Sequence, residues 1–493
     1  MSGILSLIWL LPAAGGVLCA LLPRRLTRVA AILVAAGELV LTLIVAYSFD
    51  SSHHGYQFVE QATWVPQFNV GYHLGVDGLS VWLLVLNALI ALVAVLATPA
   101  RTARLSSFLG LMLLMEAGMA GVFEALDLVL FYVFWEGMLI PAYFLLWLWG
   151  EGDRPWYAAL KFVLYTLAGS LLMLVGVIGE YAFSGAHTFD IATLAAHQPS
   201  PAIQFGLFFL FAIAFVVKVP VFPFHSWLPD AYLAAPTPFL LMFAGVMGKT
   251  GAYAMLRILL PLNPQPEGWW NWNAVLPVLA VLGIIWGALL ALAQRDIKAV
   301  VAYSSISHMG FIVLGIFAFN AQGQQGAVLQ MLNHGIIIPA LFLLVAGIQA
   351  RTGTRDREVL SDLAPRMPVM AGVFLIVTMA ALGLPGLNSF VGEFMTLLGA
   401  WQFSPWLAVA GAIGLVLAPV YMLRLFQGLM YSRTQPAHAP EPVTKRTDIA
   451  RGELALLAPL VALMFLLGLY PYLITQFLPA LGQGMQVLGS RWS

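Results

Sequence analysis

The stretch at residues 212–223, AIAFVVKVPVFP, holds one lysine and two prolines in an otherwise apolar segment. Proline lacks a backbone N–H, so Pro220 and Pro223 interrupt any helix that reaches them. Hydrocarbon offers no partner for the carbonyl groups that such a break releases. A lone ammonium such as that of Lys218 costs about 2.5–3.5 kcal/mol at the same depth. We therefore predict an interrupted membrane helix whose break and charge face protein or water.

The composition of the whole chain indicates a membrane protein. Hydrophobic residues make up 61% of the 493 residues and charged residues only 9%, a balance outside the range of soluble domains. The formal net charge is +0, and no basic run suits nucleic acid, so we expect a lipid bilayer and no nucleic-acid partner. Cys19 is the single cysteine, which excludes an internal disulfide and a cysteine-ligated iron–sulfur cluster.

Hydropathy predicts an all-α polytopic fold with about 14 membrane spans. Placing the N-terminus outside puts almost every loop lysine and arginine on the inner side, with Arg491 as the exception, so both termini are predicted outside. Alternation in TWVPQFNVGYHL (63–74) predicts an outer hairpin, and Asp77 is a candidate N-cap for span three. The predicted spans are 3–22, 29–48, 78–98, 107–125, 127–148, 158–183, 203–223, 237–260, 273–294, 299–319, 325–349, 368–399, 405–430 and 453–477.

Spans seven and twelve are both interrupted, the first at Lys218 and Pro220 and the second near Pro385 and Glu393. Paired interrupted spans indicate a repeat-built transporter core, and an offset of five spans makes the two halves inverted. We therefore predict four regions along the chain. These are an N-terminal three-helix segment with the hairpin (1–105), a first five-helix repeat (106–261), a second five-helix repeat (262–432), and an inner loop with a C-terminal helix (433–493).

Ionisable residues lie well inside seven different spans. Because each isolated charge there costs about 3 kcal/mol, pairing and internal water are expected. A carboxylate beside a lysine holds it protonated, and withdrawing that carboxylate lets the lysine release its proton. Glu136 and Lys218 are the natural pair, either as a pumping element or as a static structural ion pair. The seven residues are Glu116, Glu136, Lys218, Lys249, His308, His334 and Glu393.

Other polar residues in the spans have simpler interpretations. Glu38 and Glu116 are each either functional or helix-packing acids bonded to a neighbouring hydroxyl. Ser304, Ser305 and Ser307 precede His308 and predict a hydroxyl-rich face suited to a water chain, although a single satisfied histidine is the commoner case. Arg257 and Arg424 lie near span ends, where arginine can snorkel to water.

Several other chemistries are excluded or poorly supported. His308 and His334 could ligate one haem, but nothing else in the sequence supports it. Gly248-Lys249-Thr250 imitates the end of a phosphate loop, yet Phe243 stands where that motif needs glycine. No G-x-G-x-x-G follows a strand. We expect no cofactor and no metal in this chain.

Five segments resemble the antiporter-like subunits of respiratory complex I, and the similarity extends over nearly the whole chain. Glu393 stands where some sister subunits usually carry lysine, which favours one branch of that family. The cation antiporter subunits of multisubunit sodium/proton exchangers share much of the pattern and are the alternative. The segments are FYVFWEGMLIPAYFLLWLWG (131–150), KVPVFPFHSWLPDAYLAAPTP (218–238), KTGAYAMLR (249–257), QRDIKAVVAYSSISHMGF (294–311) and GLPGLNSFVGEF (383–394).

The resemblance implies a role for each buried residue. Glu136 and Lys218 would be the coupled pair of an input half-channel, and Lys249 the connecting proton carrier. His308 and His334 would lie on a central hydrophilic axis, and Glu393 would be the terminal proton donor and acceptor.

The resemblance also implies where the chain works and with what partners. It implies a multi-pass subunit of a bacterial inner membrane that moves protons as part of a quinone-reducing translocase. Antiporter-like membrane-arm subunits would lie on both sides, while flavin, iron–sulfur clusters and quinone would belong to partner subunits.

Overall fold

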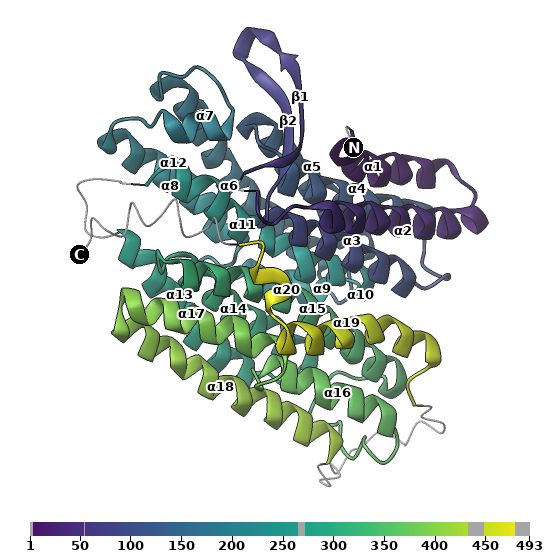
Figure 1. The fold of residues 1–493 in the computed structure, drawn as a ribbon. Helices are drawn as coiled ribbons and strands as arrows, with labels where there is room; N and C mark the ends of the chain where they lie inside the picture. Colours follow the sequence, from purple (N-terminus) through teal and green to yellow (C-terminus); the bar gives the residue numbers. More distant parts are fainter. Residues whose placement is uncertain (1–2, 54, 265–271, 432–447, 479–493) are drawn as a thin grey trace. The chain divides into compact units, whose positions relative to one another are not determined.

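The computed structural model describes residues 3–53, 55–264, 272–431 and 448–478, and most of them are helical (Figure 1). The elements of the N-terminal part are α1 (Ile4–Leu21), α2 (Arg24–Ser48), β1 (Gln57–Val65), the 3₁₀ turn η1 (Pro66–Phe68), β2 (Val70–Val76), α3 (Ser80–Ala97), α4 (Leu105–Glu124), α5 (Leu128–Trp149), α6 (Pro155–Phe183), α7 (Ile191–Ala196), α8 (Pro201–Lys218), α9 (Trp227–Ala234), α10 (Thr237–Met242), the π-helical η2 (Phe243–Met247), α11 (Gly248–Ala254), the π-helical η3 (Met255–Leu259) and α12 (Leu260–Leu262).

The C-terminal part is also helical. Its elements are α13 (Trp272–Ala293), α14 (Ile297–Ile316), α15 (Ala321–Thr352), α16 (Pro368–Ala381), α17 (Asn388–Phe403), α18 (Pro405–Met430), α19 (Arg451–Leu469) and α20 (Tyr472–Thr475).

The predicted all-α polytopic class is confirmed. Among the described residues, 13 helices are long and apolar enough to cross a membrane. Predicted span twelve (368–399) is two shorter helices, α16 and α17, which are separated by a turn with left-handed glycines at Gly383 and Gly386. The last predicted span (453–477) likewise ends earlier, at Leu469, before the short α20. The total number of spans and the orientation of the termini stay predictions.

The chain forms two compact units. The first contains residues 1–220 and 234–272, and the second contains 221–233 and 273–493. The chain therefore leaves the first unit directly after the break that follows α8. This division does not test the predicted repeats at 106–261 and 262–432, which stay predictions. The predicted inner loop at 433–447 lies outside the described residues.

Close approaches at small residues organise the first unit around α4. A side chain on Gly110 of α4 would collide with the Gly16 carbonyl of α1, 2.7 Å from the Cβ position. A side chain on Gly118 would likewise meet Met138 of α5 at 2.8 Å. Small residues let membrane helices approach closely and gain dispersion contacts where no hydrophobic effect drives them together. These glycines therefore fix α4 between α1 and α5.

The predicted hairpin is confirmed as an antiparallel pair of β1 and β2, and its place on the outer side stays a prediction. Its first strand binds the start of α1, because the Glu60 carboxylate accepts a hydrogen bond from the Leu5 amide at 2.8 Å. Its second strand binds the end of α4 through the Leu126 amide, which donates to the His73 carbonyl at 2.9 Å. The predicted cap is also present: Asp77 Oδ1 accepts from the Ser80 amide at 3.1 Å at the start of α3.

The second unit has α14 and α15 at its centre, and both are almost fully buried. Helix α17 approaches α15 so closely that a side chain on Gly399 would lie 2.3 Å from the Gly323 Cα. The segment at residues 221–233 packs in this unit too. The Tyr232 ring lies 5.9 Å from that of Phe342 on α15, and the Leu233 carbonyl accepts from Lys298 Nζ of α14 at 3.1 Å.

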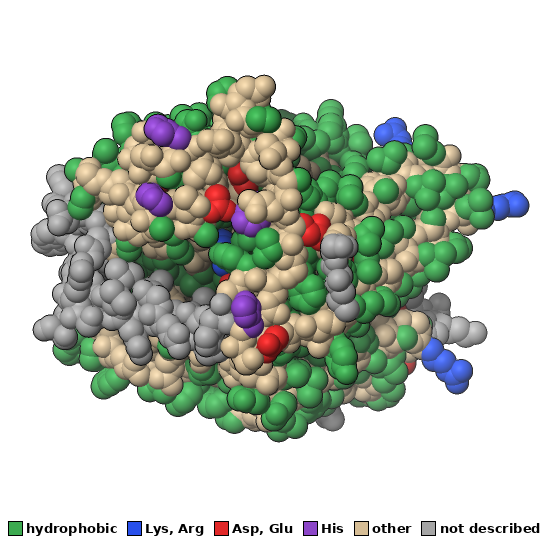
Figure 2. All heavy atoms as spheres, turned by 45° about the horizontal axis from the view of Figure 1, so that its top comes forward, with side chains coloured by type: hydrophobic (Ala, Val, Ile, Leu, Met, Phe, Trp, Pro, Cys, Tyr) green, Lys and Arg blue, Asp and Glu red, His purple; other side chains and the backbone are tan. Residues whose placement is uncertain are grey.

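The exterior is apolar. Figure 2 shows hydrophobic side chains over much of one face, with few charged groups among them. Leu33 of α2, Leu164 of α6 and Val416 of α18 are 67%, 55% and 66% exposed. Apolar surface of this extent is expected of helices that face lipid or other membrane subunits.

Candidate functional site

Lys218 is the last residue of α8, at the predicted break. The Val219 amide donates the final helical hydrogen bond, to Phe215 at 2.8 Å, and Pro220 has no N–H to continue the ladder. The Lys218 side chain is only 2% exposed, and its Nζ has no hydrogen-bond partner among the described residues. It lies 5.2 Å from the centre of the Trp135 ring, so a cation–π contact partly compensates for its burial.

Glu136 follows Trp135 on α5 and is half-buried. Its carboxylate is the charge that acts on Lys218, but it does not hydrogen-bond to Nζ. The prediction of a direct Glu136–Lys218 ion pair is therefore not met. The two groups lie within electrostatic range in an open arrangement.

Lys249 lies on the continuous buried span Thr237–Leu262, which contains α10, η2, α11, η3 and α12. Its side chain is fully buried, and Nζ donates to the Ala244 carbonyl at 2.6 Å. That carbonyl belongs to the π-helical turn η2, and a second π-helical turn, η3, follows α11. Single π-helical turns within α-helices occur frequently at functional sites.

Gly251 brings α11 against the end of α8. A Cβ atom there would lie 2.7 Å from Val219 Cγ2, 3.0 Å from Lys218 Cβ and 3.2 Å from the Phe215 carbonyl. Close packing therefore explains why residue 251, in the sequence Lys249-Thr250-Gly251, is a glycine. It lets the helix that carries Lys249 approach the lysine at the break.

We expect the Gly251→Ala substitution to displace Lys218 and destabilise the contact between α8 and α11 by about 1–3 kcal/mol, the usual cost of overpacking. The measurement is the thermal stability of the assembled protein together with its proton-translocation rate. Gly206→Ala on α8 is the matched control, because no heavy atom lies within 4 Å of its added Cβ. Equal behaviour of the two variants would contradict the packing role.

In the second unit, His308 and Glu393 are in direct contact. His308 Nδ1 of α14 lies 2.9 Å from Glu393 Oε1 of α17, and both side chains are buried. The same carboxylate oxygen accepts from Gln330 Nε2 at 2.9 Å and from Ser389 Oγ at 3.0 Å. Three helices, α14, α15 and α17, thus place polar side chains around one carboxylate oxygen.

The other Glu393 oxygen, Oε2, has no hydrogen-bond partner among the described residues. It lies near the break between α16 and α17, 3.1 Å from the position that a Gly383 Cβ would occupy. His334 of α15 continues the cluster, because its ring centre lies 5.9 Å from that of His308. An imidazole in contact with a carboxylate can exchange a proton with it, and a second imidazole extends the series.

Sequence reasoning missed Gln330, Asn333 and Ser389. Asn333 Nδ2 donates to the Asn388 carbonyl at 2.7 Å and so ties α15 to the start of α17. Helical spacing was the available signal: Gln330 precedes His334 by four residues, and Ser389 precedes Glu393 by four. Residues four apart share a helix face.

The serines before His308 are bonded to backbone carbonyls. Ser304 and Ser305 donate to the Val301 carbonyl of their own helix, at 2.8 and 3.1 Å. Ser307 donates to the Ile284 carbonyl of α13 at 2.9 Å. Their protons therefore serve helix packing, which leaves the hydroxyl oxygens as acceptors only.

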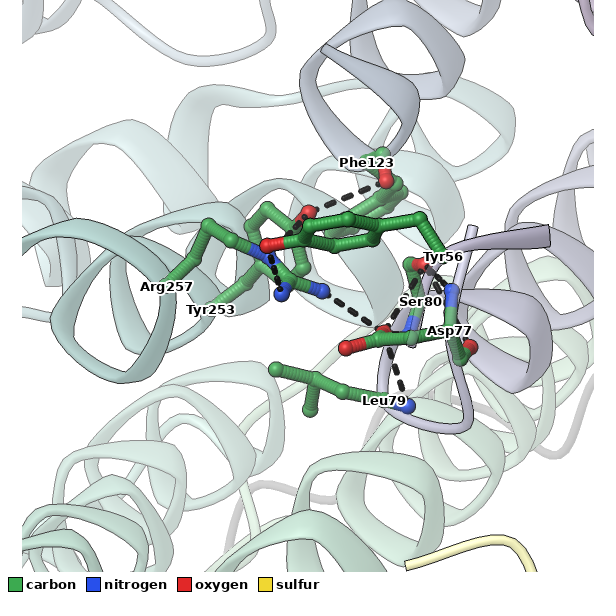
Figure 3. A network of polar contacts seen from close by, with 7 residues as sticks. All are labelled: Tyr56, Asp77, Leu79, Ser80, Phe123, Tyr253 and Arg257. Atoms are coloured by element: carbon green, nitrogen blue, oxygen red, sulfur yellow. Dashed lines mark hydrogen bonds and ion pairs between the residues drawn. The ribbon is translucent and has the colours of Figure 1, made fainter. Parts of the chain in front are cut away.

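The prediction that Arg257 snorkels to water is wrong. Arg257 is 8% exposed and forms an ion pair with Asp77, with Nη2 at 2.6 Å from Oδ1. It also donates to the hydroxyls of Tyr253 at 3.1 Å and Tyr56 at 2.9 Å, and Tyr253 donates on to the Phe123 carbonyl at 3.0 Å. Figure 3 shows this network joining η3 to the hairpin and the start of α3. The position of Arg257 near the end of a span could not reveal which residues it would contact. Arg424 is exposed, as predicted.

Asp77, which lies outside the spans, shows the effect of this pairing. Burial alone would oppose ionisation of its carboxyl group. The Arg257 guanidinium outweighs that effect, and hydrogen bonds from Ser80 add to it, so the pKa of Asp77 lies below its usual value. The ion pair is therefore complete at neutral pH.

The predicted residues thus fall into two groups. Lys218, Glu136 and Lys249 belong to the first unit, where α11 packs on α8. His308, His334 and Glu393 belong to the second. Within the described part of the chain, no group of three or more His, Cys, Asp or Glu side chains is arranged to hold a metal ion.

Comparison with known proteins finds extensive similarity. Residues 125–418 match the family described as NADH:quinone oxidoreductase/Mrp antiporter, transmembrane. The chain is 38% identical to NADH-quinone oxidoreductase subunit M of Rhodobacter capsulatus, over 97% of this chain and 95% of that protein.

Solved structures agree in fold. A chain of respiratory complex I from Thermus thermophilus with bound NADH superposes with a TM-score of 0.89 at 34% identity, covering 98% of this chain and 99% of that one. A chain of the Mrp complex from Dietzia sp. has a TM-score of 0.84 at 23% identity, with 98% and 97% coverage, which shows the fold alone.

Proposed function

Because the chain belongs to the NADH:quinone oxidoreductase/Mrp antiporter transmembrane family, we propose that it is a proton-translocating membrane-arm subunit of an NADH–quinone oxidoreductase. The observation that supports this most strongly is the contact of His308 with Glu393 in a buried, polar-lined cluster. The presence of Glu393 and the similarity to subunit M relatives favour subunit M over the other antiporter-like subunits. The expected cellular location is a bacterial plasma membrane, where antiporter-like subunits would lie on both sides of this chain.

The proposed mechanism is electrostatic. A change in a neighbouring subunit moves the Glu136 carboxylate toward or away from Lys218, and the open arrangement of the two groups leaves room for such a change. When the carboxylate withdraws, burial favours the neutral lysine, which releases its proton. Lys249 accepts that proton in the first unit. His334, His308 and Glu393 carry charge through the second.

No side chain of the described residues supplies redox chemistry in this proposal. Quinone reduction in partner subunits, with their flavin and iron–sulfur clusters, provides the driving energy. This chain provides groups that bind and release protons in a region from which lipid excludes bulk water.

The second candidate function is a cation/proton antiporter subunit of a multisubunit sodium/proton exchanger. The Mrp likeness in fold favours it, but the identity of 23% is lower than the 38% shared with the oxidoreductase relative. Purification from native membranes distinguishes the two. Co-isolation with flavin and iron–sulfur proteins supports the first function, and sodium-dependent exchange without them supports the second.

We expect the Glu393→Gln substitution to lower proton pumping and coupled quinone reduction by about tenfold or more, because a positioned proton-transfer group is removed. The amide keeps the shape of the side chain, so assembly is expected to stay intact. The measurement is quinone reduction and proton uptake in vesicles that contain the whole complex.

Glu358→Gln is the control for this experiment. Glu358 lies outside the spans, its side chain is more than half exposed, and its carboxylate pairs with the exposed Arg295 at 3.3 Å. Pumping at the wild-type rate in Glu393→Gln would contradict the proposed terminal role. A loss of equal size in Glu358→Gln would point to a general charge effect.

A further inference from the structure

Two carboxylic acids outside the proposed relay lie together in the first unit. Glu38 of α2 and Glu116 of α4 are both 0% exposed, and α2 and α4 pack against each other. Asn87 of α3 joins them: its Nδ2 lies 3.4 Å from Glu38 Oε1 and donates to the Glu116 backbone carbonyl at 3.2 Å. Three membrane helices therefore converge on one polar site in an apolar interior.

The site holds more acceptor atoms than donors. Glu38 Oε2 and both carboxylate oxygens of Glu116 are buried without a hydrogen-bond partner among the described residues. Asn87 is also fully buried, and its Oδ1 has no donor in the described part of the chain. Buried acceptors without donors are costly, so this site favours the binding of a species that donates a hydrogen bond.

Among the residues that the structure describes, no cationic side chain acts on the pair. Helices α1 and α3 carry no charged residue, and the three arginines of α2 (Arg24, Arg25 and Arg28) lie ten or more residues before Glu38, about 15 Å along the axis. The groups on the other elements against α4 are Glu136 of α5, Lys249 of α11 and His73 of β2, and none of them acts on the pair. Glu124 of α4 is a further buried acid, and the charges of Glu38 and Glu60 act on it.

We propose that Glu38 and Glu116 form a proton-binding site, in which the two buried carboxyl groups share a proton beside Asn87. Two carboxylates in contact in a low-dielectric site do not both ionise, because each disfavours the charge of the other. One proton on the pair acts as a hydrogen-bond donor and removes one of the two charges. A metal ion fits less well, since no third acidic, cysteine or histidine ligand joins the two carboxylates among the described residues.

This site goes beyond the proposed relay and does not depend on it. It lies on α2, α3 and α4, whereas the proposed relay in this unit uses α5, α8 and α11. Whether the pair binds a proton can also be measured without turnover. The proton-binding site can therefore be confirmed even if the proposed pumping function is wrong, and it can be refuted even if the pumping function is correct.

The test is infrared difference spectroscopy of the intact complex in membranes, recorded as a function of pH for wild type, Glu38→Gln and Glu116→Gln. We expect each substitution to remove the absorption of a protonated carboxyl group at neutral pH. We also expect the effects to be non-additive: the double variant changes the spectrum by less than the sum of the single variants, because both remove the same shared proton.

Glu180→Gln on α6 is the matched control. Glu180 is also 0% exposed, and both of its carboxylate oxygens lack partners among the described residues, but no second acid acts on it. Its spectral change is therefore expected to add to that of Glu38→Gln. If Glu38→Gln or Glu116→Gln fails to assemble, Glu38→Asp and Glu116→Asp keep an acid and are expected to shift the shared absorption.

Two results would overturn the proposal. One is additive behaviour of Glu38→Gln and Glu116→Gln, which would make them independent acids. The other is an absorption that responds to sodium at constant pH, which would indicate a cation site instead of a proton site.

Discussion

The Lys218→Ala variant is expected to lose proton translocation by about a hundredfold, in the range measured for positioned proton-transfer groups, and to lose coupled quinone reduction with it. Lys218 is a fully buried ammonium at the end of α8, without a hydrogen-bond partner among the described residues. Removing it also removes the cost of burying a charge, so the folded state is not expected to be less stable. The measurements are turnover and proton uptake in vesicles, with assembly checked by native gel.

Lys218→Arg tests whether the lysine acts as a proton carrier or as a fixed charge. Arginine keeps the positive charge but does not deprotonate in proteins. We expect this variant to be as inactive as Lys218→Ala if the proton leaves the side chain during turnover. Recovery of pumping by arginine would instead support the static ion-pair interpretation, and wild-type pumping in Lys218→Ala would overturn the mechanism.

The Asp77→Asn variant is expected to destabilise the first unit by about 3–5 kcal/mol, because it leaves the Arg257 guanidinium buried without its counter-charge. The Arg257–Asp77 pair joins η3 to the start of α3, and Tyr56 attaches the hairpin to the same guanidinium. Thermal unfolding and limited proteolysis of the hairpin measure the effect. Because the pKa of Asp77 lies below its usual value, its contribution is complete at neutral pH and is lost only as the pH falls through that lowered value.

The double variant Asp77→Asn, Arg257→Met separates the lost pair from the orphaned charge. We expect it to recover part of the stability, since no uncompensated charge remains in the interior. Asp50→Asn is the control, because Asp50 is an exposed acid before the hairpin whose carboxylate accepts hydrogen bonds from Ser52 in its own turn. Equal losses in the single and double variants would assign the effect to Asp77 alone.

The break at α8 was predictable because its cause is local. Proline stops a helix whatever surrounds it, and the structure ends α8 two residues before Pro220. The hairpin was predictable for the same reason, since alternation and turn residues act over a few positions. The helical class follows from apolar length, because hydrocarbon allows only helices or closed barrels.

The partners of the buried charges were not predictable in the same way. His308 and Glu393 are separated by 85 positions, and only the packing of α14 against α17 brings them into contact. Arg257 and Asp77 illustrate the opposite error, since a position near a span end carries no information about a hairpin that folds back over it. The predicted roles of the six relay residues are statements about dynamics, and they stay predictions.

The two π-helical turns around Lys249 have a consequence for changes in chain length. Each such turn accommodates a surplus residue, because its hydrogen bonds span five positions instead of four. Deleting one residue from Phe243–Met247 would return that turn to ordinary α-helix and leave Lys249 on nearly the same side of the axis, whereas deleting one residue from regular α-helix rotates the residues beyond it by about 100°. The two π-helical turns thus allow the chain to lose one residue on either side of α11 while the direction of the Lys249 ammonium is kept.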